Sequence, residues 1–136
     1  MDAVQLTTDL RMLVYTSVLA FILPLAYGAA RAMTPGGLTW GMGNRDGEKV
    51  ALPAWSLRAE RAHANLLENL APFAILVLVA HLSGQASDVT ALAARIFFWA
   101  RVAHALVYIA GITRVRTAVF FAGLGAELVI LFQILA

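Results

Sequence analysis

The sequence predicts an all-α integral membrane protein built as a four-helix bundle. Of its 136 residues, 61% are hydrophobic and only 13% are charged, and the mean hydropathy is +0.79. Soluble domains contain about 45–50% apolar and about 25% charged residues. The apolar residues also gather into four stretches, each close to the about 20 residues that a helix needs to cross a bilayer core of about 30 Å. Composition and pattern therefore agree on a membrane protein.

The predicted spans cover residues 11–32, 58–82, 91–112 and 116–136 of one domain, 1–136. The first span lacks a preceding basic segment and a convincing cleavage site, so we interpret it as a retained helix. A glycine-rich polar loop, residues 33–57, follows it, and the other connections, SGQASD and GITRVR, are short. Short connections make neighbouring helices antiparallel. An up-down bundle with both termini on one side is therefore expected.

Charge gives the expected orientation and excludes some functions. Arginine and lysine gather around the first and third loops, so these loops should face the cytoplasm and the termini should face outward. A bacterial inner membrane fits, with an organellar membrane left open. The net charge of +2 is dispersed, which argues against a nucleic-acid surface. The sequence has no cysteine, so thiol chemistry requires a thiol-bearing ligand.

A polar stripe begins the second span, in RAERAHANLLENLAPF, residues 58–73. On a helix, residues three and four apart share a face, which places Arg58, Arg61, Asn65, Glu68 and Pro72 on one line. Charged residues inside a span are costly and usually face the bundle interior or a wet cavity. The stripe is therefore a candidate binding site.

A second stripe lies in the third span, where Arg101, His104 and Tyr108 share a face. Guanidinium groups bind carboxylates in a bidentate way, and Glu and Asn accept amines and amides. Together the two stripes suit a small zwitterion with several carboxylates. The alternative is structural: arginines that extend to the membrane surface, with Glu68 paired to Arg101 across the helices.

The residues of these stripes carry a family resemblance. RAERAHANLLENLAPF resembles the second-helix signature of the MAPEG family, the membrane-associated proteins in eicosanoid and glutathione metabolism. ARVAHALVYIAG, residues 100–111, is similar to the third helix of its microsomal prostaglandin E synthase branch. The resemblance covers about residues 58–136. It implies a homotrimer in membrane lipid, with glutathione between subunits near the cytoplasmic face and a lipophilic electrophile arriving from the bilayer.

The resemblance also implies roles for individual residues. Six would bind glutathione as the cosubstrate: Arg61, Asn65, Glu68, Arg101, His104 and Tyr108. The catalytic arginine of the family opens its fourth helix. Arg116, followed by Thr117, is the best match, although a one-residue gap in the loop leaves Arg114 as a rival. A free thiol titrates at about 8.5, and a neighbouring guanidinium stabilises the thiolate nucleophile.

Two positions depart from the family. Phe120 stands where several members have a tyrosine, and Ala64 stands where the prostaglandin synthase branch has a second arginine. The sequence thus predicts a glutathione-dependent membrane transferase or peroxidase. The alternative is a non-catalytic MAPEG-like protein that binds a lipid or an anionic metabolite, or a structural membrane partner.

Three further features call for structural interpretations. Glu60 and His63 form one Glu-x-x-His pair, but a di-metal site needs two, so no metal site is expected. Gly123 and Gly125 favour close helix packing. Glu127 lies near the middle of the fourth span, which favours a structural or oligomer-interface role.

Overall fold

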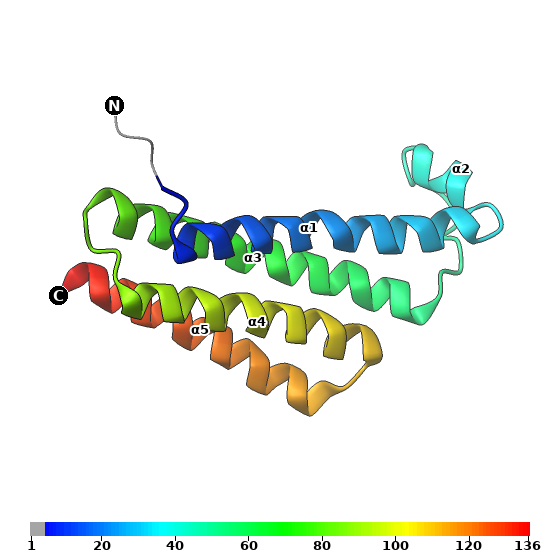
Figure 1. Ribbon diagram of the computed structural model, residues 1–136. Coiled ribbons are helices and arrows are strands. Elements are labelled where there is room, and N and C mark those ends of the chain that lie inside the picture. The colour runs from blue at the N-terminus through cyan, green and yellow to red at the C-terminus, as the bar shows by residue number, and fades with distance from the viewer. Residues whose placement is uncertain (1–4) are drawn as a thin grey trace.

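The computed structural model describes residues 5–136, and every regular element in this range is a helix (Figure 1). The helices are α1 (Thr8–Met33), α2 (Gly37–Met42), α3 (Ala54–Leu82), α4 (Asp88–Ala110) and α5 (Thr113–Leu135). The four long helices, α1, α3, α4 and α5, are each long and apolar enough to cross a membrane. The predicted all-α membrane fold is confirmed.

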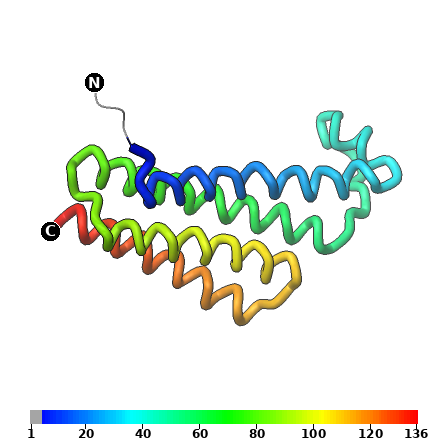
Figure 2. The backbone as a smooth tube through the Cα atoms, in the orientation of Figure 1, coloured from blue at the N-terminus to red at the C-terminus, as the bar shows by residue number. Residues whose placement is uncertain are grey.

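The long helices lie side by side and alternate in direction, as the backbone trace in Figure 2 shows. The start of α1, the end of α5 and the loop 83–87 lie at one end of the bundle, which we call the terminal end. The opposite end carries α2 and the turn between α4 and α5, and we call it the α2 end. The most extensive helix contact joins α4 to α5, and α1 packs chiefly on α3.

The boundaries of several helices differ from the prediction. α4 ends at Ala110 and is capped by Gly111, whose φ of +81° is left-handed. The extended residue Ile112 then caps α5, which begins at Thr113. Glycine adopts this conformation without strain, so a two-residue turn suffices. The connection is therefore shorter than the stretch GITRVR that the sequence indicated for it. α3 begins earlier than expected, at Ala54, because Pro53 has a φ of −56° that suits a helix start.

The connection between α1 and α3 is also more ordered than a simple connector. It contains α2, which packs on Arg31 at the end of α1. A Cβ at Gly37 would lie 2.1 Å from the carbonyl oxygen of Arg31, and a Cβ at Gly41 would lie 2.7 Å from its Cδ. The glycines of this loop thus allow a helix to approach another backbone closely, a role that composition alone did not reveal.

An apolar core fills the half of the bundle nearer the terminal end. Phe73 of α3 stacks on Phe97 of α4 with ring centroids 3.8 Å apart, and Ile130 of α5 completes the contact. Large apolar side chains also cover the outside, where Phe21 is 71% exposed and Leu25 is 72% exposed. Apolar residues both inside and outside are what a lipid environment requires.

Buried polar groups are found at two levels of the bundle. At the terminal end, the carboxylate of Asp9 accepts hydrogen bonds from the backbone of Leu10 (3.1 Å) and the hydroxyl of Thr90 (3.5 Å), which joins the starts of α1 and α4. Further along α4 and α5, Arg101, His104 and Glu127 are buried between the helices. The second group lies among the predicted site residues.

Candidate functional site

Arg101 occupies the centre of the candidate site. Its side chain extends from α4 and is only 1% exposed. Nη1 donates to Oδ1 of Asn65 in α3 (3.3 Å), and Nη2 donates to the carbonyl oxygen of Phe120 in α5 (3.2 Å). One guanidinium therefore links three helices and brings two of the predicted site residues, Arg101 and Asn65, into direct contact.

Aromatic rings provide most of the remaining surroundings of Arg101. Its Cζ lies 5.1 Å from the ring centroid of Phe97 and 5.3 Å from that of Phe120, distances at which a cation is attracted to a ring. Within residues 5–136, Nε of Arg101 and Oε1 of Glu127 are buried without a hydrogen-bond partner. Two hydrogen bonds and two aromatic rings thus hold the positive charge of Arg101 in place.

His104 and Tyr108 continue this arrangement along α4 toward the α2 end. His104 is buried, and its ring meets that of Tyr108 edge to face, with centroids 5.5 Å apart. The guanidinium of Arg116 lies over the other end of this pair, 4.4 Å from the ring centroid of Tyr108. The predicted residues Arg101, His104, Tyr108 and Arg116 therefore form a continuous line from the core to the start of α5.

The two candidates for the catalytic arginine differ in their surroundings. Arg116 lies in the first turn of α5 and is half-buried against Tyr108, whereas Arg114 is exposed. Thr117 directs its hydroxyl to the carbonyl oxygen of Thr113 in its own helix (3.4 Å). Arg116 is thus joined to the line on α4, and the hydroxyl of Thr117 bonds to its own helix.

The stripe on α3 divides into residues with different environments. Asn65 is half-buried and faces Arg101, while Arg61 and Glu68 are exposed on the protomer surface. Glu68 therefore does not pair with Arg101, and the structural alternative of an interhelical bridge between them is wrong. The ion pair found within residues 5–136 is instead that of Arg31 with Glu60 (3.7 Å).

Arg58, which begins the predicted stripe, has a structural position. Its Nε donates to the carbonyl oxygen of Ile109 (2.7 Å) at the end of α4. A basic side chain at this place satisfies a free carbonyl and interacts favourably with the helix dipole. The guanidinium packs on this turn, because a Cβ at Gly111 would lie at an ordinary contact distance of 3.6 Å from its Cζ. Arg58 thus secures the turn between α4 and α5.

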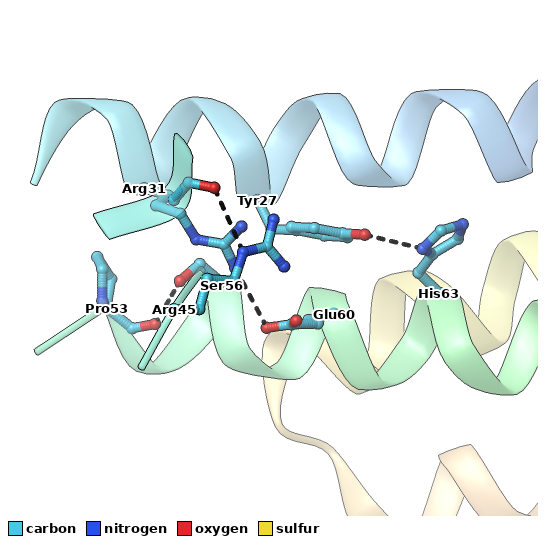
Figure 3. A network of polar contacts seen from close by, with 8 residues as sticks. Tyr27, Arg31, Arg45, Pro53, Ser56, Glu60 and His63 are labelled. Atoms are coloured by element: carbon cyan, nitrogen blue, oxygen red, sulfur yellow. Dashed lines mark hydrogen bonds and ion pairs between the residues drawn. The ribbon is translucent and has the colours of Figure 1, made fainter. Parts of the chain in front are cut away.

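A second polar network, which the sequence interpretation missed, joins α1 to α3 (Figure 3). The hydroxyl of Tyr27 and Nδ1 of His63 are 3.0 Å apart, and Arg31 pairs with Glu60 and lies 5.6 Å from the ring of Trp40. The signal was present: Tyr27 and Arg31 are four apart on one helix, and Glu60 and His63 are three apart on the other. These residues hold α1 against α3, and Arg31 also holds α2 against α1.

Two apolar grooves open along α1. One, of about 210 Å³, lies between α1 and α4 and is lined by residues such as Ile22 and Phe98. The other, of about 380 Å³, lies between α1 and α3, where Phe21 and Leu67 line it and His63 provides a polar group. Both are on spans, so both are accessible to molecules dissolved in the bilayer.

The family model for MAPEG matches residues 12–136. This chain belongs to the MAPEG family. The match includes α3, α4 and α5 in full and α1 from residue 12 onward, and it confirms the resemblance that α3 and α4 carry. Together with the four apolar helices, it identifies an integral membrane protein.

Curated relatives of the chain include microsomal glutathione S-transferase 1 from Homo sapiens, Rattus norvegicus and Bos taurus. Each is 35% identical over 79 residues, which represent 57% of this chain and 51% of the relative. The chain thus spans about half the length of the curated relatives it matches.

Proposed function

We propose that this protein is a glutathione-dependent membrane transferase or peroxidase in which Arg116 stabilises the glutathione thiolate. The line Arg101–His104–Tyr108–Arg116 carries this proposal, because it connects a buried, fixed guanidinium to a second, half-buried one at the start of a helix. We propose glutathione as the thiol substrate because the curated relatives are named microsomal glutathione S-transferase 1.

Arg116 suits the catalytic role for two physical reasons. A guanidinium stays protonated, so it attracts the thiolate at every relevant pH and raises the fraction of the nucleophilic form. Its place in the first turn of α5 adds the positive end of the helix dipole. In the transferase reaction the thiolate attacks an electrophilic carbon and forms a thioether, while a leaving group departs or an opened ring or double bond takes up a proton. In the peroxidase reaction the thiolate attacks the outer oxygen of a hydroperoxide, and the O–O bond breaks to give glutathione sulfenic acid and, after protonation, an alcohol or water. A second glutathione then condenses with the sulfenic acid to give the disulfide and water.

The peptide part of glutathione would be held by the α3 stripe. Asn65 presents an amide beside Arg101, and the exposed Arg61 and Glu68 offer partners for a carboxylate and an ammonium group. Because Glu68 lies near the midpoint of α3, leaving these groups against lipid would be costly. Other copies of the chain that cover the stripe would remove this cost, and the assembly that we propose is the homotrimer that the MAPEG resemblance implies.

The electrophile would enter from the membrane. The grooves along α1 are apolar and open on the spans, which favours a lipophilic substrate with a reactive carbon or a hydroperoxide. An apolar groove discriminates weakly among apolar shapes, so a broad substrate range is expected.

The experiment is an ultraviolet difference titration of the purified protein with glutathione, which detects the thiolate band at neutral pH. The wild type should give a saturable band, Arg116→Ala should lose it, and Arg114→Ala should retain it. A band that survives in Arg116→Ala and disappears in Arg114→Ala would transfer the catalytic role to Arg114.

Calorimetry in parallel distinguishes the non-catalytic alternative. Glutathione that binds the native state should raise the thermal midpoint of the wild type and release or absorb heat on titration. If neither binding nor a thiolate band is found, the transferase proposal is wrong, and a scaffold that binds another lipid or anion takes its place.

A further inference from the structure

Gly123 of α5 lies directly against the guanidinium of Arg101. A Cβ built at this glycine would be 2.2 Å from Nη2 and 2.9 Å from both Cζ and Nε. No pair of such atoms tolerates this separation, so any side chain at position 123 must displace Arg101. Gly125, two residues further along the same helix, has no atom within 4 Å of its corresponding position. The two glycines therefore have different surroundings.

The missing side chain determines where the guanidinium can lie. Because α5 presents bare backbone at Gly123, Nη2 reaches the carbonyl oxygen of Phe120 while Nη1 remains 3.3 Å from Oδ1 of Asn65. The hydrogen bond to the Phe120 carbonyl fixes the plane of the guanidinium. Because the guanidinium is rigid and planar, fixing Nη2 also fixes the direction in which Nη1 donates. The orientation of the Asn65 amide thus depends on Gly123 of α5, although Arg101 lies between these two residues.

We propose that Gly123 is a positioning residue of the glutathione site: it makes room for Arg101, and Arg101 in turn orients the Asn65 amide toward the ligand. This inference rests on the proposed function and assigns Gly123 a role distinct from helix packing. Phe120 takes part through its backbone carbonyl, a contact that does not depend on its side chain.

A side chain at position 123 should shift Arg101 without unfolding the bundle. Glu127 lies one turn beyond Gly123 on the same face of α5, and its buried Oε1 has no hydrogen-bond partner within the part of the chain that the structure describes. A displaced guanidinium therefore has a carboxylate to move toward. The expected result is a folded protein in which Asn65 has lost its partner.

The test compares Gly123→Ala with Gly125→Ala, its matched control, by the glutathione dissociation constant and the thiolate band. Gly123→Ala should weaken glutathione binding about tenfold, the effect of losing one charge-assisted hydrogen bond. Gly125→Ala should bind as the wild type does, because its Cβ points into open space. Equal losses in the two variants would mean that both glycines serve packing alone, and the inference would be wrong.

A double-mutant cycle with Arg101→Lys separates positioning from general damage. Lysine lacks the guanidinium that the new Cβ would meet, so adding Gly123→Ala to Arg101→Lys should cause no further loss of binding. Independent, additive losses would overturn the inference. If Gly123→Ala alone does not fold, the double variant should still fold like Arg101→Lys, and its failure to do so would equally overturn the inference.

Glutathione binding by the wild type distinguishes a failure of the proposed function from a failure of the role proposed for Gly123. A wild type that binds no glutathione overturns the proposed function, and the inference that rests on it is lost as well. A wild type that binds glutathione, with no difference between the two glycine variants, leaves the proposed function intact and removes only the role of Gly123.

Discussion

The arginines of α3 and α4 share a sequence pattern but have different surroundings. Arg101 is buried and joins three helices, Arg58 caps the end of α4, and Arg61 remains exposed. Helical periodicity correctly placed each on a polar face. It did not reveal which would be buried, because that depends on partners such as the Phe120 carbonyl and on the space left by Gly123. The sequence thus indicated which polar side chains share a helix face, but it did not indicate which contacts they make.

Replacing Arg58 with alanine tests its capping role. The change removes the bond to the Ile109 carbonyl, and it should lower the free energy of unfolding by about 1 kcal/mol, since the arginine is only half-buried. The measurement is the thermal midpoint of the detergent-solubilised protein. Arg95→Ala, a change at an exposed arginine of α4, is the control and should leave the midpoint unchanged. An equal midpoint for the two variants would contradict the capping role.

Among the elements, the four spans could be predicted because a membrane helix needs little more than a long apolar run. The ends of the helices depended on finer features: the left-handed Gly111, Pro53 before α3, and Arg58 reaching across from another helix. α2 escaped prediction because it is six residues long and contains glycine, a poor helix former. Its stability comes from contact with Arg31 rather than from its own sequence.

The packing of α2 can be tested through Gly37. In Gly37→Ala the new Cβ would meet the carbonyl oxygen of Arg31, an atom of the backbone that cannot move aside, so α2 should detach from α1. Trypsin should then cleave faster after the exposed Arg45 and Lys49.

Gly28→Ala is the matched control for this experiment, because no atom lies within 4 Å of its Cβ position in α1. Cleavage that remains as slow in Gly37→Ala as in the wild type and the control would show that α2 is held by other contacts.

The whole molecule has two distinct ends, which the positive-inside rule assigned to opposite sides of the membrane. The absence of cysteine from the sequence allows this orientation to be measured with single substitutions. Asp46, in the loop at the α2 end, and Gln85, in the loop at the terminal end, are both exposed.

Asp46→Cys should react with a membrane-impermeant maleimide only in inverted vesicles, and Gln85→Cys only in right-side-out vesicles. The lysine and arginine residues of the first loop are the physical reason, since they favour the cytoplasmic side. Labelling of both cysteines from the same side would mean that the bundle does not cross the membrane as its helices suggest. The reverse pattern would invert the orientation.

The exposed Glu68 also has a consequence for the synthesis of the protein. A charged residue at the centre of a helix opposes insertion by about 2.5–3.5 kcal/mol, so α3 should leave the translocon less readily than its apolar length suggests. A newly made chain would be unstable in the bilayer until another surface covers this carboxylate. During that interval proteases that remove unassembled membrane proteins should recognise it, so the cellular abundance of the protein, as well as its binding of glutathione, should depend on position 68.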